Sequence, residues 1–156
     1  MKKQYLFPAL CVILIVLVSI PAYGYIAHRD AMTKNGIQWK KAVSAVQADE
    51  VFLNSLIPFD WDGFYVFFGP AEKEEMQQTM GIESGDVQAL SAQGQSAVYI
   101  VKGDKIICRA DGTAGAAVVV SADGGSPIIC SPSDDARFTV TEENGRKDFI
   151  LQPTEE

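Results

Sequence analysis

The chain has 156 residues, of which 47% are hydrophobic, and a formal net charge of −7. This length suits one ordinary domain. Only Lys2, Lys3 and Arg29 carry charge before residue 30, so residues 30–156 hold 20 acidic and 10 basic residues, a net charge of −10. Such an acidic domain repels phosphate backbones, which argues against nucleic acid as a partner. We interpret the acidity as a solubility feature.

The first 29 residues are typical of a membrane-targeting segment. Residues 5–27 form an uncharged run of 23 residues, and a spanning helix needs about 20. Lys2 and Lys3 precede the run, which predicts a cytoplasmic N-terminus. We therefore expect residues 1–29 to be a signal anchor that contacts the membrane through residues 5–27.

The domain that follows, residues 30–156, is then expected outside the cytoplasm on a single-pass anchor. The alternative is a secreted protein that is cleaved near Gly24. There, Ala22-Tyr23-Gly24 offers small residues at the two positions that a signal peptidase reads. Both alternatives place the domain on the far side of the membrane.

Two helices are predicted in the domain. Over residues 37–55, apolar side chains recur at intervals of three, four and seven, and Pro58 closes the pattern. A second helix is expected after Pro70, where three glutamates suit a positive N-terminal end. Gly81 suits the C-terminal cap of that helix.

Alternation and turn residues predict strands at residues 64–68, 96–102, 105–110, 117–121, 128–130, 137–142 and 146–151. The first of these is apolar on both faces, which indicates a central strand covered on both sides. Gly103-Asp104 and Asn144-Gly145 fit two-residue hairpin turns. The order of elements predicts an α+β fold with one antiparallel sheet of about five or six strands and two helices on one face.

The only histidine, His28, lies outside the domain. Histidine-dependent catalytic sites and histidine–zinc sites are therefore not expected there. No Gly-rich phosphate-binding loop follows the required pattern either. We predict no catalytic residue, no metal ligand and no cofactor.

Carboxylates supply the remaining candidate chemistry. Asp60 and Asp62 resemble the opening of a calcium loop, but the position that requires a bidentate acid is Ala71. We expect the two aspartates to cap a turn. A hydrolase that uses carboxylates alone would need Asp60, Asp62 or Asp134 to converge in a pocket with raised pKa values.

Cys108 and Cys130 are the cysteines of the domain, and both fall in predicted strands. An exported protein meets an oxidising environment, so they are a candidate disulfide. The alternative is two separate buried thiols.

Residues 59–75 read F-D-W-D-G-F-Y-V-F-F-G-P-A-E-K-E-E. This segment resembles a motif of small, uncharacterised bacterial membrane-anchored or secreted proteins, with an aromatic-Asp-Trp-Asp turn, a Tyr/Phe strand and a proline before an acidic helix start. Those proteins carry Tyr-Thr where this chain has Ala71-Glu72. The resemblance implies an export segment and a compact α+β domain, and it implies no activity.

The expected function is therefore a membrane-anchored, extracytoplasmic module that binds a partner, such as another envelope protein, or serves the envelope structurally. A small carboxylate-dependent hydrolase is the alternative. A candidate interaction surface is the aromatic turn Phe59, Trp61, Phe64 and Tyr65, because exposed aromatic side chains mark interfaces. The competing interpretation is that these side chains close the core.

Overall fold

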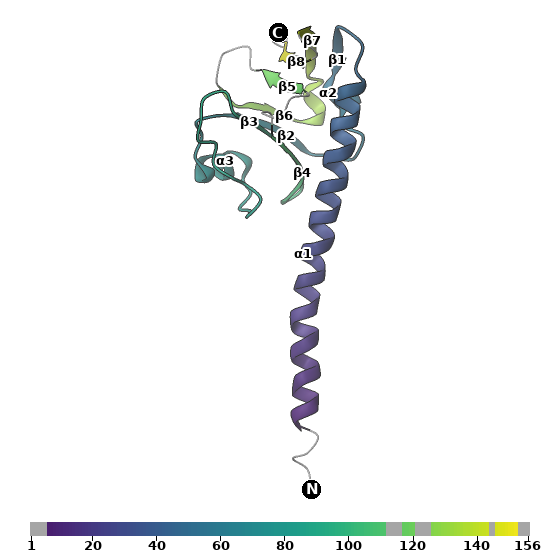
Figure 1. Cartoon of the computed structure of the whole chain (residues 1–156), viewed down its shortest axis with the longest axis vertical. Helices are drawn as coiled ribbons and strands as arrows, with labels where there is room; N and C mark the ends of the chain where they lie inside the picture. The colour runs from purple at the N-terminus through teal and green to yellow at the C-terminus, as the bar shows by residue number, and fades with distance from the viewer. Residues whose placement is uncertain (1–5, 112–116, 121–125, 144–145, 153–156) are drawn as a thin grey trace. The chain divides into compact units, whose positions relative to one another are not determined.

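The computed structural model describes residues 6–111, 117–120, 126–143 and 146–152. Side chains are described from residue 23 to residue 152, outside 112–125 and 143–146. Within the uncharged run, Tyr5 and the side chains of residues 6–22 therefore lie outside the described residues, as does the Asn144-Gly145 turn. The chain divides into two units, residues 1–31 and residues 32–156. Figure 1 labels the elements in chain order.

The first element, α1, is a helix from Leu6 to Ala45. Within the part of the chain that the structure describes, no helix has the length and apolarity to cross a membrane. The predicted helix at 37–55 is correct as far as Ala45 and wrong beyond it. A short strand β1, Glu50–Phe52, and a single helical turn α2, Leu53–Leu56, follow instead.

Pairing with a distant strand explains this correction. Val51 of β1 lies opposite Phe138, and the Leu53 backbone N–H donates to the Ala136 carbonyl at 2.8 Å. These bonds satisfy backbone groups that a continued helix would satisfy internally. The end of α1 is held by Lys147, whose ammonium donates to the Ser44 carbonyl at 3.1 Å and to the Val46 carbonyl. A cation there complements the negative end of the helix.

One sheet has the strand order β4-β3-β2-β6, with every pair antiparallel. Its strands are β2 Gly63–Phe68, β3 Ser96–Lys102, β4 Lys105–Asp111 and β6 Ile128–Cys130. The central position predicted for residues 64–68 is confirmed, because β2 lies between β3 and β6 and is buried on both faces. Phe64 belongs to one core cluster and Phe67 to the other.

The second sheet has the order β1-β7-β8-β5. Here β7 is Arg137–Glu143, β8 is Arg146–Leu151 and β5 is Ala117–Val120. Three of its strands are antiparallel, and β5 runs parallel to β8. Ser121, which was predicted as the last residue of the strand that corresponds to β5, lies outside the described residues.

The α+β class is confirmed, but the single sheet is wrong: the described ranges form two sheets of four strands. The reason is apolar burial. Phe138 and Phe149 of the second sheet are 1% and 2% exposed, and they pack in one cluster with Phe64 of the first. Two apolar faces that cover one another bury more surface than one sheet with a solvated face.

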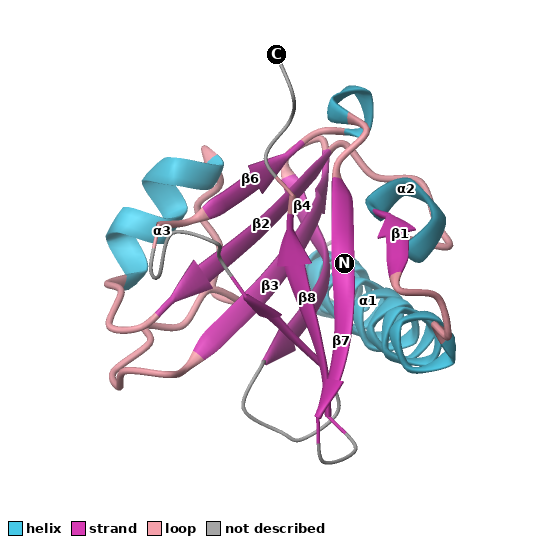
Figure 2. Cartoon of the chain, turned by 90° about the horizontal axis from the view of Figure 1, so that it is seen from above, coloured by secondary structure: helices cyan, strands magenta, loops and turns pink. Residues whose placement is uncertain are grey.

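The helices also lie on opposite faces of the β4-β3-β2-β6 sheet, rather than on one. Trp39 and Val43, near the end of α1, join the cluster between the sheets. Met76 and Met80 of α3, Lys73–Met80, cover the other face. A strand with apolar side chains on both faces requires cover on both. Figure 2 shows α3 on one side of the strands and α2 on the other.

The cap of α3 agrees with the sequence-based expectation. Gly81 has a left-handed φ of 68° and follows Met80 directly. Glycine adopts this conformation without a Cβ penalty. The Ile82 N–H donates to the Gln77 carbonyl at 3.1 Å, so the chain reverses and delivers Ile82 to the same core cluster.

Candidate functional site

The aromatic turn before β2 belongs to the core. Trp61 is 8% exposed and Phe64 is fully buried, and the Phe64 ring lies 5.7 Å from the Trp39 ring. Phe59 and Tyr65 are half-buried and pack against the two core clusters. This burial favours the competing interpretation, that the four side chains close the core, and the candidate interaction surface stays a prediction.

The two aspartates of this turn hold a hairpin. The carboxylate of Asp60 forms an ion pair with the Lys102 ammonium at 2.9 Å, and that of Asp62 accepts the Gly103 backbone N–H at 2.7 Å. The Asp62 N–H in turn donates to the Val101 carbonyl at 2.8 Å. Both carboxylates therefore secure the end of β3 and the β3–β4 turn.

The Lys102 ammonium beside Asp60, through its hydrogen bond and its charge, holds the pKa of that carboxyl below its ordinary value. A general acid would require the opposite shift. Asp134 caps a single 3-10 turn, Pro132–Asp134, where its carboxylate accepts the Ser131 N–H. The carboxylates that the hydrolase alternative needs thus have structural partners, and that alternative stays a prediction without support from their geometry.

Cys108 and Cys130 are free, buried thiols. Cys108 lies opposite Ile100, Ile100 lies opposite Phe64, and Phe64 lies opposite Cys130. Three strand spacings of about 4.8 Å separate them by about 14 Å, whereas a disulfide requires Cα atoms within about 7 Å. The candidate disulfide is therefore absent, because β3 and β2 lie between the strands that carry the two cysteines. Burial raises the pKa of Cys108 to about 12 and that of Cys130 to about 11.

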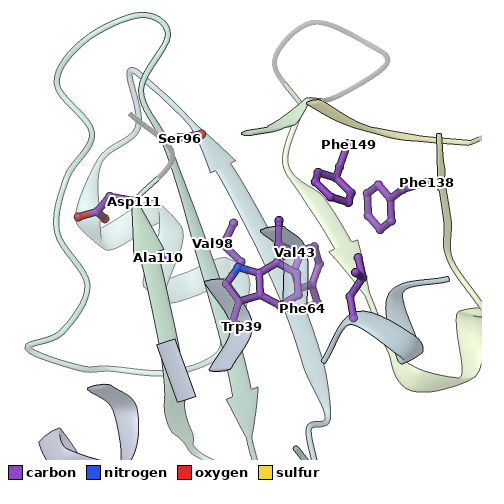
Figure 3. Close-up of a pocket in the computed structure, with 10 residues that line it drawn as sticks. Trp39, Val43, Phe64, Ser96, Val98, Ala110, Asp111, Phe138 and Phe149 are labelled. Carbon is purple, nitrogen blue, oxygen red and sulfur yellow. The ribbon is translucent and has the colours of Figure 1, made fainter. Parts of the chain in front are cut away.

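A small cavity of about 30 Å³ lies between the two sheets. Figure 3 shows the rings of Trp39, Phe64, Phe138 and Phe149 gathered around it, with the Asp111 carboxylate turned away. A water molecule needs at least about 10–15 Å³ by this measure. The cavity is thus large enough for one or two waters and too small for an organic ligand.

A larger, open groove of about 480 Å³ lies between residues 32–37 of α1 and the edge strand β4. One wall is Met32, Thr33, Gly36 and Ile37 of α1, and the other is Gln88, Arg109 and Asp111. Binding sites commonly enclose about 300–1,000 Å³. The volume of this groove falls in that range, so it is a candidate ligand site.

The first wall is placed by two contacts of α1 with β4. The Asn35 amide donates to the Ile107 carbonyl at 2.9 Å. A Cβ on Gly36 would lie 3.6 Å from the Arg109 carbonyl oxygen, an ordinary van der Waals distance, so the helix backbone lies beside the strand at this position. The helix thereby covers a sheet edge that would otherwise be open to pairing, and Ile37 is left 65% exposed on the rim.

The second wall is ordered around Arg109. Its guanidinium donates to the Asp111 carboxylate at 3.0 and 3.2 Å and to the Gln88 side-chain oxygen at 2.9 Å. It also donates to the Asp86 carbonyl at 3.1 Å and lies 6.0 Å from the centre of the Tyr99 ring. Five polar or aromatic contacts on one planar group keep the loop 86–88 against the sheet.

No pattern in the sequence predicted this groove. Its walls come from residues 32–37, 88 and 109–111, and no short motif joins them. The one usable signal is Arg109, a charged residue that directly follows three apolar residues, Ile106, Ile107 and Cys108, in the predicted strand. Such a residue is buried only with partners, and it is 18% exposed at its side chain.

The described residues contain no group of three or more histidine, cysteine, aspartate or glutamate side chains able to hold a metal ion. No family model, curated protein or solved structure matches the chain.

Proposed function

We propose that this protein is a non-enzymatic binding module, anchored in the membrane by residues 5–27, that displays residues 30–156 outside the cytoplasm. The observation that carries the proposal is the open groove between α1 and β4. The anchor is supported by the uncharged run of 23 residues and by Lys2 and Lys3 in front of it.

The groove suits a short peptide segment of an envelope protein. Met32 and Ile37 line it from the helix, where they offer apolar contact, and Gln88 and Asp111 offer polar contact from the other side. Asp111 is 56% exposed at its side chain, and residues 30–156 carry a net charge of −10. Long-range attraction therefore favours a partner segment that combines an apolar side chain with positive charge.

The bonding of the candidate carboxylates supports the non-enzymatic part of the proposal. Asp60 and Asp62 bond to the β3–β4 hairpin, and neither lines the groove. Both carboxylates hold the fold, and the lowered pKa of Asp60 is opposite to the raised pKa that a general acid needs.

Site-specific photocrosslinking in a bacterial host tests the groove. A photoreactive residue is placed at Ile37 or at Gln88 of the full chain, and at Ile129, which is 56% exposed on β6, as the control. We expect discrete adducts from the two groove positions and none from Ile129. Asp111→Asn should weaken the groove adducts without changing the circular dichroism spectrum. Equal adducts at Ile129, or none at the groove positions, would contradict the proposal.

The placement of the domain has its own test. A C-terminal reporter enzyme that is active only outside the cytoplasm should be active on the full chain. Fractionation should recover the fusion with the membrane. Activity of a matched cytoplasmic reporter would show that the orientation is reversed, whatever the crosslinking result.

A further inference from the structure

We infer that the segment Tyr23–Ile26 of α1 lies in the membrane–water interface, with the lipid headgroup layer as its partner. The inference rests on the proposed anchor and deepens it, because it assigns the level at which the chain leaves the bilayer. Tyr23, Tyr25 and Ile26 are 76%, 59% and 57% exposed, and they are large apolar or amphipathic side chains on one helical turn.

The placement of these side chains around the helix selects the partner. A helix turns about 100° per residue, so Tyr23 and Tyr25 project about 200° apart, on nearly opposite sides. A protein groove covers one stripe of a helix and would leave one of the rings in water. A lipid interface surrounds the helix and contacts both. Tyrosine is suited to that layer, because its ring is apolar and its hydroxyl is polar.

The charge pattern places the boundary within the same turn. The uncharged run ends at Ala27, and Arg29 and Asp30 follow directly after His28. The Arg29 guanidinium lies over the Tyr25 ring, 5.8 Å from its centre. A cation near the headgroups interacts favourably with lipid phosphates, so the tyrosine ring and the arginine that covers it form a joint contact between acyl chains and phosphate.

Ile37 gives a contrast on the same helix. It is 65% exposed, but it follows Arg29, Asp30 and Lys34 in the sequence and lines the groove of the domain. Exposure alone therefore does not identify the segment in the membrane–water interface. Two features together identify it: exposed rings on opposite sides of the helix, and the end of the uncharged run.

Depth measurement by spin labels tests the inference on the full chain. Cys11→Ala removes the cysteine of the uncharged run, and Cys108 and Cys130 stay buried and unlabelled. Single cysteines then replace Ile20, Gly24, Ala27 or Ala31 and receive a nitroxide. The protein is reconstituted in vesicles of phosphatidylcholine and phosphatidylglycerol, and the accessibility of each label to oxygen and to a water-soluble nickel chelate is compared.

We expect the label at position 20 to be more accessible to oxygen and the label at position 31 to be more accessible to the nickel chelate. The crossing, which is the position where the preference changes from oxygen to nickel, should fall between residues 23 and 27. A chain that floats with the vesicles but crosses elsewhere, for example with position 31 still shielded from nickel, overturns this inference and leaves the anchor intact. A chain that does not float with the vesicles overturns both.

A variant pair tests the role of the rings. Replacing both tyrosines, Tyr23→Ala with Tyr25→Ala, should shift the crossing by at least one residue, because the interfacial anchors are lost. Ile37→Ala, the matched change of an exposed apolar residue on the same helix, should leave the crossing in place. An unmoved crossing in the double variant would show that the rings do not contact the interface.

Discussion

The carboxylate of Asp62 accepts a hydrogen bond from the backbone N–H of Gly103 at 2.7 Å, across 41 positions of sequence. Gly103 has a φ of +58° in the β3–β4 turn, a conformation that glycine adopts without strain. The bond connects the residue before β2 to the β3–β4 hairpin. The Asp-Trp-Asp turn therefore stabilises one end of the β4-β3-β2-β6 sheet.

Asp62→Ala should lower the free energy of unfolding by about 1 kcal/mol, because the Gly103 N–H loses its acceptor. Asp62→Asn keeps an acceptor oxygen in place and should retain most of the stability. Urea unfolding of the full chain in detergent, followed by the fluorescence of the buried Trp39 and Trp61, measures both. Equal losses in the two variants would show that the charge matters and the hydrogen bond does not.

The Asp60–Lys102 pair should make stability depend weakly on pH. The folded pKa of Asp60 lies below its ordinary value of 3.8, so its contribution is present above that value and is lost as pH falls through the folded pKa. The Asp60 side chain is 91% exposed, so the effect is small and screened by salt. At pH 6, the Asp60→Asn variant should unfold at a lower urea concentration than the parent protein. At pH 2, the two proteins should have the same urea midpoint.

Adding 1 M NaCl at pH 6 should narrow that difference. A difference between the two proteins that persists at pH 2 would mean that the Asp60→Asn substitution perturbs the turn itself rather than removing an ion pair.

Gly69 should tolerate no side chain. A Cβ there would overlap the backbone oxygen of Ala92 and lie 3.2 Å from the Leu90 Cβ. Its N–H donates to the Gln95 carbonyl at 2.9 Å, so the backbone is not free to move aside. Gly69→Ala should cost about 1–3 kcal/mol of stability, the usual range for overpacking.

Gly85→Ala is the matched control, because a Cβ at that position meets nothing within 4 Å. It should change stability by no more than about 0.5 kcal/mol. Urea midpoints of both variants provide the comparison, and a similar loss at the two glycines would show that the close contact at Gly69 is not its cause.

The two cysteines should resist thiol reagents until the domain unfolds. With pKa values raised to about 12 and about 11, the thiolate fraction at pH 8 is about one in ten thousand at Cys108 and about one in a thousand at Cys130. Maleimide labelling of the Cys11→Ala chain should be slow in buffer and rapid in urea. Mass spectrometry without reductant should find two free thiols, and a mass two hydrogens lighter would contradict the register that separates them.

Local patterns in the sequence predicted most strands because their causes are local. The strand at 63–68 alternates between two apolar faces and ends at Gly69-Pro70, and Gly103 favours the turn between 96–102 and 105–111. Gly81 likewise marks the end of α3. The class of fold, α+β, follows from the order of these elements.

The missed features depend on partners far away in the chain. β1 has three residues, too few for a period, and it exists because it pairs with β7. Lys147 ends α1 from more than a hundred residues away. The groove combines α1, residue 88 and β4, so no single segment contains its signal.

What the sequence alone determined, then, is the uncharged N-terminal run, the strong negative charge of residues 30–156, and the positions of most strands, because composition and short-range periodicity are properties of neighbouring residues. The tertiary structure decided which strands pair, so the apolar residues divide between two sheets and two core clusters. It also decided that Trp61 and Phe64 are buried, that Cys108 and Cys130 stay apart, and that a groove opens beside Arg109. Each of these outcomes depends on burial and hydrogen bonding between distant segments, which become neighbours only when the chain folds.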